Sequence, residues 1–244
     1  MIHSLSIVIP AYNEERRLPA TLAVLDSFLG QESFSFLEIL IVNDGSRDGT
    51  AALVEEYART HPRYRLLNNP GNRGKGYSVR HGMLEARGEW VLFSDADLSA
   101  PIEEWTKLAG AAEKQGAAVA IGSRALDRSL VGVHQPAFRE YMGRFFNLVM
   151  RMSTGLPFAD TQCGFKLYRR DAAREIFKRQ LLDGFSFDVE DLMIAKLLGY
   201  KVVEVPVRWN DVQGTKVSML HGAKSFGDLL QIRWNQARGR YRRS

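Results

Sequence analysis

The chain has 244 residues, of which 45% are hydrophobic and 25% are charged, with a formal net charge of +5. This is the composition of an ordinary globular protein, and a chain of this length can bury a large core without disulfides. The one cysteine, Cys163, excludes an intrachain disulfide and indicates a reducing compartment. Met1–Ser4 lacks the features of a signal peptide, and no apolar run reaches the ~20 residues that span a bilayer. We therefore expect a cytoplasmic protein, or a peripheral one on the cytosolic face of a membrane.

Strand and helix patterns alternate five times in the first half of the chain. The apolar run 5–10 stops at a proline and predicts a buried strand, and leucines at helical spacing follow it from Leu18 to Leu29. Further strands are expected at 37–42, 64–67, 89–93 and 117–121, and further helices from Asp48 to Tyr57, at 74–86 and at 103–114. This alternation predicts an α/β fold with a mostly parallel sheet covered by helices on both faces.

The second half of the chain is less regular. Its patterns predict a Phe- and Met-rich amphipathic helix at 139–153, a strand at 164–169, a helix at 188–198, a strand at 202–207 and a helix at 223–236. The chain has no linker-like segment, so we expect one domain over 1–220 with a C-terminal amphipathic helix and basic tail over 221–244. Arg233–Ser244 contains five arginines and no acid, which suits an anionic partner or an idle solvated end.

Polar residues gather where three of the predicted strands end. Tyr12, Asn13 and Glu14 follow the first strand, 43–46 follows the second, and 95–97 follows the fourth. In open sheets of this kind, ligands bind beyond the carboxyl ends of the strands. The three acidic strand ends therefore predict one candidate site.

Asp95 and Asp97 are the candidate metal ligands. Two carboxylates two residues apart at a strand end can both turn toward one hard cation. Mg²⁺ and Mn²⁺ accept one or two carboxylates together with substrate phosphates, and a bound cation neutralises a leaving diphosphate. We therefore expect Mg²⁺ or Mn²⁺ as the cofactor.

Asp44 and the glycine-rich segment 71–76 have two interpretations each. Asp44 accepts hydrogen bonds from a nucleoside, or it caps the helix that follows Asp48. The segment GNRGKG matches neither the P-loop nor the dinucleotide fingerprint. It either brings backbone N–H groups and two cations to a phosphate or is an ordinary loop.

Three arginines, Arg124, Arg139 and Arg144, lie after the fifth strand and on the next helix, where guanidinium groups can bind phosphate. The five histidines lack zinc spacing, and no nucleophile elbow is present. No recognition helix or stacking strand is evident, so we expect no nucleic-acid partner.

Several motifs together resemble glycosyltransferase family 2, which has the GT-A fold. They are SIVIPAYNEE at 6–15, IVNDGSRDGT at 41–50, NPGNRGKG at 69–76 and FSDADL at 93–98. In the second half, DTQCGFKL at 160–167, FDVEDL at 187–192 and VPVRWNDVQGTK at 205–216 resemble the dolichyl-phosphate β-glucosyltransferases and related polyprenyl-phosphate hexose synthases.

The resemblance implies a role for each candidate residue. Asp95 and Asp97 would hold the metal, and Arg124 and Arg139 would act with them in catalysis. Arg124, Arg139 and Arg144 would meet the acceptor phosphate. The donor would be held by Pro10, Tyr12, Glu14, Asp44, Lys75 and Lys216.

Two features depart from the relatives. Mannose synthases often have glutamine two residues past the second Asp as a further metal ligand, where this chain has Ser99, so Ser99 or water would complete the metal shell. Eukaryotic relatives have an N-terminal membrane span, which this sequence lacks. We therefore expect the protein to meet the membrane through Phe145, Phe146, Val149 and Met150 and through the arginines of 238–243. Deleting 238–244 would then spare turnover of a soluble acceptor.

The reaction implied is inverting transfer of a hexose, glucose from UDP-glucose, to a polyprenyl or dolichyl phosphate. A phosphate monoester with a second pKa of about 6 needs no general base. One alternative is transfer to a glycan hydroxyl, for which Glu190 or Asp191 would be the base. The other is a catalytically idle module that binds a nucleotide sugar.

Overall fold

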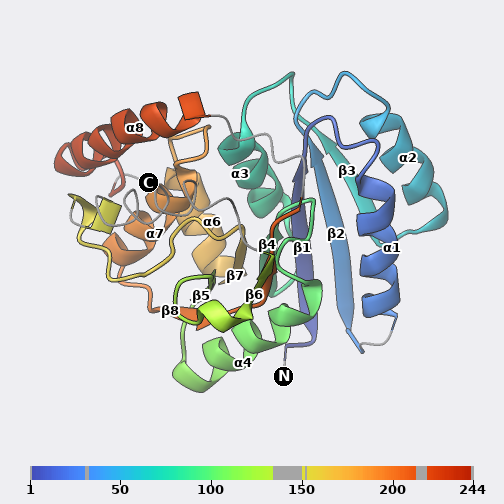
Figure 1. Ribbon diagram of the computed structural model, residues 1–244, viewed down its shortest axis with the longest axis horizontal. Coiled ribbons are helices and arrows are strands. Elements are labelled where there is room, and N and C mark those ends of the chain that lie inside the picture. The colour runs from blue at the N-terminus through green and yellow to red at the C-terminus, as the bar shows by residue number, and fades with distance from the viewer. Residues whose placement is uncertain (1, 31–32, 134–149, 152, 213–218, 243–244) are drawn as a thin grey trace.

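A seven-stranded sheet with the order β3-β2-β1-β4-β7-β5-β8 forms the centre of the part of the molecule that the structure describes (Figure 1). The structure is a computed structural model, and it describes residues 2–30, 33–133, 150–151, 153–212 and 219–242. The strands of the sheet are β1 (Ser4–Ala11), β2 (Phe36–Asn43), β3 (Tyr64–Asn68), β4 (Trp90–Ser94), β5 (Val119–Ser123), β7 (Phe165–Arg169) and β8 (Val202–Pro206). β6 (Val131–Val133) and β9 (Trp209–Asn210) pair separately.

The sheet is mostly parallel, as the sequence predicts. β1 pairs in parallel with β2 and β4, β2 with β3, and β5 with β8. β7 lies between β4 and β5 and is antiparallel to both. A strand from the second half of the chain thus separates two strands that follow one another in the first half.

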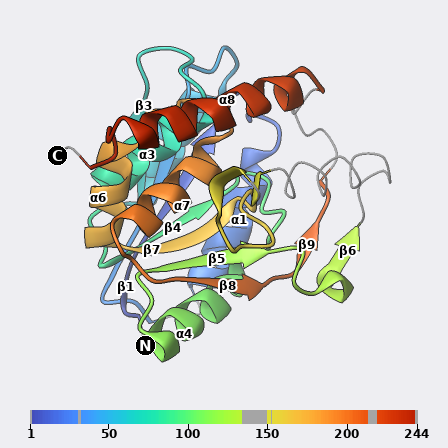
Figure 2. The ribbon, with the colours of Figure 1, turned by 90° about the vertical axis from the view of Figure 1, so that its left-hand side faces the viewer.

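Helices cover both faces of the sheet (Figures 1 and 2). Alternate residues of β1 face opposite ways: Ile7 and Ile9 belong to one core cluster and Val8 to the other. The cluster with Ile7 includes residues of α1 (Leu18–Leu29), α2 (Thr50–Thr60) and α4 (Trp105–Gln115). The cluster with Val8 includes residues of α3 (Lys75–Glu85), α6 (Arg170–Arg179), α7 (Phe187–Leu197) and α8 (Met219–Ala237). Two 3₁₀ turns, η1 (Ile102–Glu104) and η2 (Arg128–Leu130), complete the described elements.

The predicted start of the helix after Asp48 is confirmed. The Asp48 carboxylate accepts a hydrogen bond from the Thr50 amide at 3.0 Å, at the first residue of α2. A short polar side chain in this position satisfies an amide that the helix itself leaves unpaired. Gly49 is the N-cap of α2, and Asp48, not Asp44, supplies the side-chain acceptor at this helix start.

The helix α6 was not predicted. Its sequence, RDAAREIFKR, is dominated by charged residues. One face nevertheless buries Ala172, Ala173, Ile176 and Phe177. Apolar residues at this helical spacing pack against the sheet while the charged side chains remain on the outer face.

Most of the helix predicted at 139–153 lies outside the described residues, and Arg139, Arg144, Phe145, Phe146 and Val149 are among those outside. Met150 is described and fully buried. It belongs to the same core cluster as α3 and α7. The prediction that Met150 faces a membrane is therefore wrong, because its side chain completes the core.

The predicted C-terminal helix is present, and the described part of the basic tail is anchored to the protein at Tyr241. Tyr241 is 0% exposed, and its hydroxyl donates a hydrogen bond of 2.8 Å to Glu190 of α7. The chain folds back after α8 because Gly239 adopts a left-handed φ of +67°. Arg238, Arg240 and Arg242 stay exposed around this buried anchor.

None of the helices in the part of the chain that the structure describes is both long and apolar enough to cross a membrane.

Replacing Tyr241 with Phe is expected to lower the free energy of unfolding by about 1–2 kcal/mol, because it leaves a buried Glu190 oxygen without its donor. Urea unfolding measures the loss, and Tyr200→Phe, at a half-buried tyrosine packed against the same cluster, should cost less than about 0.5 kcal/mol. For the same reason, deleting 238–244 should lower the melting temperature. Equal losses in the two tyrosine variants would show that the Tyr241 hydroxyl has no role.

Candidate active site

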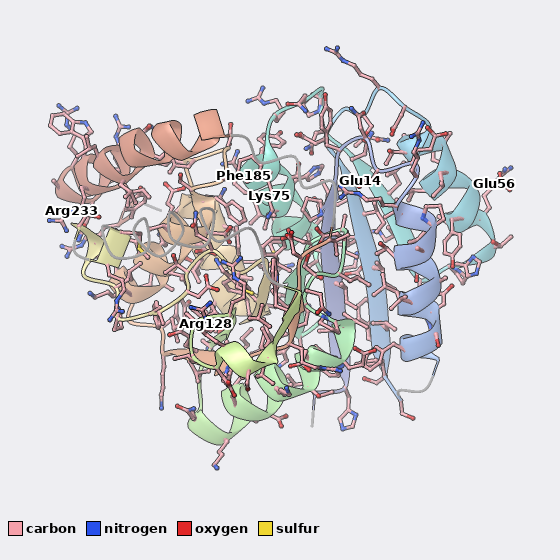
Figure 3. All side chains as sticks on the ribbon, viewed as in Figure 1. Glu14, Glu56, Lys75, Arg128, Phe185 and Arg233 are labelled. Carbon is pink, nitrogen blue, oxygen red and sulfur yellow. The ribbon has the colours of Figure 1, made fainter. Side chains whose placement is uncertain are left out.

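The polar strand ends meet at one edge of the sheet, as predicted. Ala11 at the end of β1 is in register with Asn43 at the end of β2, and β4 runs in parallel beside β1. Two hydrogen bonds link the segments that follow these strands. The Glu14 amide donates to the Thr50 hydroxyl at 2.8 Å, and the Thr21 hydroxyl donates to the Ala96 carbonyl at 2.6 Å. Figure 3 shows Glu14 and Lys75 at this end of the sheet.

Asp95 lies against β7 and forms an ion pair with Lys75. The Asp95 amide donates to the Gly164 carbonyl at 3.0 Å, and the Lys75 Nζ lies 2.7 Å from Asp95 Oδ1. A Cβ at position 164 would stand 2.0 Å from Asp95 Oδ2. Only glycine at 164 therefore leaves room for the Asp95 carboxylate in this position.

The charges around Asp95 suit a cation. Burial raises the pKa of Asp95, since the Lys75 ammonium offsets only part of this effect and the Asp97 and Asp188 carboxylates add to it. Among the described residues, no group of three or more His, Cys, Asp and Glu side chains could hold a metal by itself. A pair of carboxylates is, however, the set that Mg²⁺ and Mn²⁺ use when substrate phosphates supply the other ligands. Asp95 and Asp97 fit that kind of site.

Asp97 sits in a tight turn. Leu98 has a left-handed φ of +47°, and the Ser99 amide donates to Asp97 Oδ1 at 3.0 Å. The Ser99 carbonyl in turn accepts a hydrogen bond from the Asn210 amide at 2.8 Å. The backbone of Ser99 thus holds the Asp97 carboxylate in place, whichever group completes a metal shell.

Lys75 is the first residue of α3 and is enclosed by aromatic rings. Its Nζ lies 5.4 Å from the centre of the Phe93 ring and 5.8 Å from that of Phe185 (Figure 3). The neighbouring Asp95 and Asp188 carboxylates raise the pKa of Lys75 although burial lowers it. Lys75 is therefore a fixed cation beside the acidic pair.

Asp44 anchors the glycine-rich segment. Its carboxylate accepts hydrogen bonds of 2.8 Å from the Arg73 and Gly74 amides and one of 2.9 Å from the Asn69 side chain. Gly74 has a φ of +109°, and a Cβ there would stand 2.4 Å from the Asp183 carbonyl oxygen. The Asp44 carboxylate and a glycine at 74 together set the course of the chain into α3 and so position Lys75.

Glu14 is paired with Arg17. Its carboxylate accepts two hydrogen bonds of 2.7 Å from the Arg17 guanidinium. Hydrogen bonding to Glu14 raises the pKa of Arg17, and the charge of Asp97 contributes in the same direction. Arg17, which the sequence did not single out, thus links Glu14 electrostatically to Asp97. Tyr12 and Pro10, at the end of β1, are half-buried.

Arg124 is held by Asp160. The Arg124 Nε and a terminal nitrogen donate to the two Asp160 oxygens at 2.6 and 2.9 Å, and the Arg124 amide donates to one of them at 3.1 Å. The Trp209 ring lies 5.5 Å from the guanidinium carbon. The Asp160 carboxylate outweighs burial and raises the pKa of Arg124. The arginine therefore stays charged and fixed in direction, with Asp95 among its electrostatic neighbours.

A buried ionic network lies beneath the site. Lys166 of β7 is fully buried, and its Nζ contacts Asp188 Oδ1 at 2.6 Å and Asp191 Oδ2 at 3.3 Å. The Tyr168 hydroxyl also donates to Asp191. Burial raises the pKa of Asp191 in spite of Lys166, and its Oδ1 lacks a described partner. An acid in this enclosed position cannot reach a sugar hydroxyl.

Glu190 is likewise engaged inside the protein. It is 0% exposed, and one oxygen accepts hydrogen bonds from the Leu181 and Leu182 amides at 3.1 and 2.8 Å. The other oxygen accepts the Tyr241 hydroxyl. Neither of the acids that the sequence offered as a general base faces the open site.

The structure thus brings together Asp95, Asp97, Lys75 and Arg124, and it places Asp44 and Glu14 behind them. Arg139, Arg144 and Lys216 lie outside the described residues. Gly164, Asp160, Lys166 and Arg17 contribute to the site, although sequence reasoning gave them no role. The motif DTQCGFK contains three of these four residues and was the signal for them.

Comparison with known proteins identifies the family. The model of glycosyl transferase family 2 matches residues 6–177. The chain belongs to glycosyl transferase family 2. It is therefore a glycosyltransferase enzyme, and the predicted family and enzyme class are confirmed.

The curated relatives match most of the chain. A dolichyl-phosphate beta-glucosyltransferase of Trichomonas vaginalis is 38% identical over 235 residues, which cover 93% of this chain and 72% of the relative. The human dolichyl-phosphate beta-glucosyltransferase is 33% identical over an alignment of 252 residues, gaps included, which covers 98% of this chain and 77% of the relative.

Solved structures share the fold. Mannosyl-3-phosphoglycerate synthase from Rubrobacter xylanophilus matches with a TM-score of 0.70 at 17% identity, covering 97% of this chain and 75% of that one. Glucosyl-3-phosphoglycerate synthase from Mycobacterium tuberculosis, in complex with Mn²⁺, uridine diphosphate and glucosyl-3-phosphoglycerate, matches with a TM-score of 0.66 at 17% identity, covering 94% and 80%. The predicted GT-A fold with a C-terminal helix is confirmed.

Replacing Gly164 with Ala is expected to abolish most activity with little effect on the fold. The added Cβ collides with the end of the Asp95 side chain, which can rotate away but then leaves the position that it shares with Lys75. Product formation and Mn²⁺ binding should both fall, while the melting temperature changes by only a few degrees. Gly110→Ala in α4 is the matched control, since a Cβ there meets nothing within 4 Å. Full activity in Gly164→Ala would contradict the proposed position of Asp95.

Proposed function

We propose that this enzyme transfers glucose from UDP-glucose, with inversion, to a polyprenyl or dolichyl phosphate, and that it needs Mg²⁺ or Mn²⁺. The observation that carries the proposal is the pair of carboxylates, Asp95 and Asp97, beside Lys75 at the carboxyl edge of the sheet. The names of the curated relatives support the glucosyl group and the lipid phosphate. A solved structure with the same fold contains Mn²⁺ and uridine diphosphate, which supports the donor and the cation.

The donor diphosphate would bind next to the acidic pair. Asp95 and Asp97 would hold the divalent cation, which when bound neutralises charge on the leaving diphosphate. Lys75 is fixed 2.7 Å from Asp95 and would add a positive charge to the same place. Positive groups that are already in place need no reorganisation as negative charge develops on the leaving group.

The nucleoside would lie over the ends of β1 and β2. Pro10, Tyr12, Glu14 and Asp44 are the proposed contacts. Asp44 accepts hydrogen bonds from the Arg73 and Gly74 amides, and Glu14 accepts them from Arg17, which supports a positioning role for both acids in the donor pocket. Lys216 remains a proposed donor contact on the basis of the family resemblance.

The acceptor would be a phosphate monoester. Its second pKa of about 6 leaves it largely dianionic at neutral pH, so the nucleophile is ready without a base. Arg124 stays charged because of Asp160 and would orient this dianion, with Arg139 and Arg144 as further proposed contacts. A single displacement at the anomeric carbon inverts its configuration and gives a β-linked product. An acceptor anchored in a membrane would place the enzyme on the cytosolic membrane face.

The experiment that tests the function is an assay of nucleoside diphosphate release. The enzyme is incubated with a panel of nucleotide sugars and with undecaprenyl or dolichyl phosphate. We expect turnover with UDP-glucose, loss of turnover in excess EDTA and recovery with Mg²⁺ or Mn²⁺.

Asp95→Asn and Asp97→Asn should each lower the rate about a hundredfold or more. Asp171→Asn, at an exposed aspartate of α6, is the control and should leave the rate unchanged. Full turnover in EDTA would contradict the metal role.

Transfer to a glycan hydroxyl requires a general base, and the burial of Glu190 and Asp191 argues against that alternative. Glu190→Gln and Asp191→Asn keep the shape of each side chain and an acceptor oxygen for the neighbouring donors. We therefore expect both variants to retain most of their activity toward the lipid phosphate. A general base would show as a fall of about 10²–10⁴-fold, with the fold checked by circular dichroism. Such a fall in a folded variant would favour the hydroxyl acceptor.

A further inference from the structure

The outward face of α8 carries an apolar ridge that is largely exposed. Leu230 is 74% exposed and Trp234 is 55% exposed. The opposite side of the helix is buried through Leu229 and Ile232. Leu230, Trp234 and Ala237 follow one another at a spacing of four and three residues, so they form one stripe along the helix. The stripe therefore leaves apolar side chains in contact with water, which is typical of a surface that binds a partner or a membrane.

Arginines flank the apolar ridge. Arg233 and Arg238 are exposed on either side of it, and the Arg238 guanidinium stacks over the Trp234 ring at 4.1 Å. The sequence after Asp228 has no acidic residue, and two further arginines, Arg240 and Arg242, lie exposed beyond the helix. Together Leu230, Arg233, Trp234, Ala237 and Arg238 form what we call the α8 ridge, and its charge is of one sign.

The helix that carries the α8 ridge is bonded to the segment that borders the candidate site. In Figure 1 α8 begins beside α3 and extends away from it, and Figure 3 shows Arg233 of the α8 ridge on the side of the molecule far from Glu14. The Ser186 hydroxyl donates to Asp228 of α8 at 2.7 Å. Ser186 directly follows Phe185, whose ring encloses Lys75. The α8 ridge, which begins at Leu230, is therefore linked through this hydrogen bond to the segment beside Lys75.

We propose that the α8 ridge binds the surface of an anionic lipid bilayer. An apolar stripe with tryptophan can enter the boundary between headgroups and acyl chains, and the flanking arginines then reach the anionic headgroups. The uniform positive charge complements a negatively charged surface rather than a second copy of the chain, which carries the same charge there. This inference rests on the proposed function, because a polyprenyl phosphate stays in the bilayer and the enzyme must come to it.

The test is binding of the full-length chain to vesicles of phosphatidylcholine with about 30% phosphatidylglycerol, measured by co-sedimentation at low salt. Two variants address the two parts of the α8 ridge. Arg233→Gln/Arg238→Gln should weaken binding about 25-fold, since each basic residue at an anionic surface contributes about fivefold. Leu230→Ser/Trp234→Ser should weaken it about tenfold or more by removing the apolar contact.

Matched controls separate the α8 ridge from general effects. Arg59→Gln/Arg63→Gln removes the same charge at exposed positions near the end of α2. Val24→Ser removes an exposed apolar side chain from α1. Both controls should bind vesicles as the unmodified chain does. Quenching of Trp234 fluorescence by brominated lipids, absent in Trp234→Phe, would place the α8 ridge in the bilayer.

A second readout distinguishes this inference from the proposed function. With a short water-soluble polyprenyl phosphate and no vesicles, Leu230→Ser/Trp234→Ser should turn over as fast as the unmodified chain. Vesicle binding that depends on the α8 ridge, without any transfer to lipid phosphate, would support the inference and contradict the function. Three outcomes would overturn the inference and, if transfer to the soluble acceptor persists, leave the function standing. They are equal vesicle binding by all variants, no vesicle binding at low salt, and self-association through the α8 ridge.

Discussion

The position of the Asp95 carboxylate depends on its contact with the backbone of Gly164. Because β7 pairs with β4, Phe165 lies beside Ser94 at the end of β4, and the Asp95 amide donates to the carbonyl of the preceding Gly164 at 3.0 Å. A carboxylate in this enclosed place is disfavoured as an anion, and its near neighbour Asp97 repels it. Lys75 offsets part of this effect, so a cation that binds the pair would lower the remaining cost.

The other acids near the site anchor its walls. Asp44 holds the glycine-rich segment, Glu14 holds Arg17, Asp160 holds Arg124, and Glu190 holds the amides before α7. Each of these carboxylates is buried, so removing its partner would leave an uncompensated charge at considerable cost. These hydrogen bonds and ion pairs fix the directions of Lys75 and Arg124 relative to Asp95, as the proposed transfer requires.

The C-terminal segment joins the site to the outer surface. Tyr241 is bonded to Glu190, which in turn holds Leu181 and Leu182, and α8 is bonded through Asp228 to Ser186. The segment between α6 and α7 is therefore held from one side by the C-terminus, while on its other side it contacts Gly74 and Lys75. An interaction at the outer face of α8 lies only one layer away from the residues that enclose Lys75.

The sequence by itself determined the sheet, the strand ends and the acidic pair, because hydrophobic periodicity and strand-end chemistry are local properties. Its strand ends predicted Asp95 and Asp97, and the family resemblance added Lys75 and Arg124; the structure brings these four together. Only the tertiary structure decided that β7 pairs antiparallel with β4 next to Asp95. It also decided that Glu190 and Asp191 are enclosed and that Tyr241 and Met150 belong to the core. Those outcomes depend on contacts between segments far apart in the chain, such as Tyr241 with Glu190 and Gly164 with Asp95. No local pattern encodes such contacts, because burial is set by what the rest of the chain places around a residue.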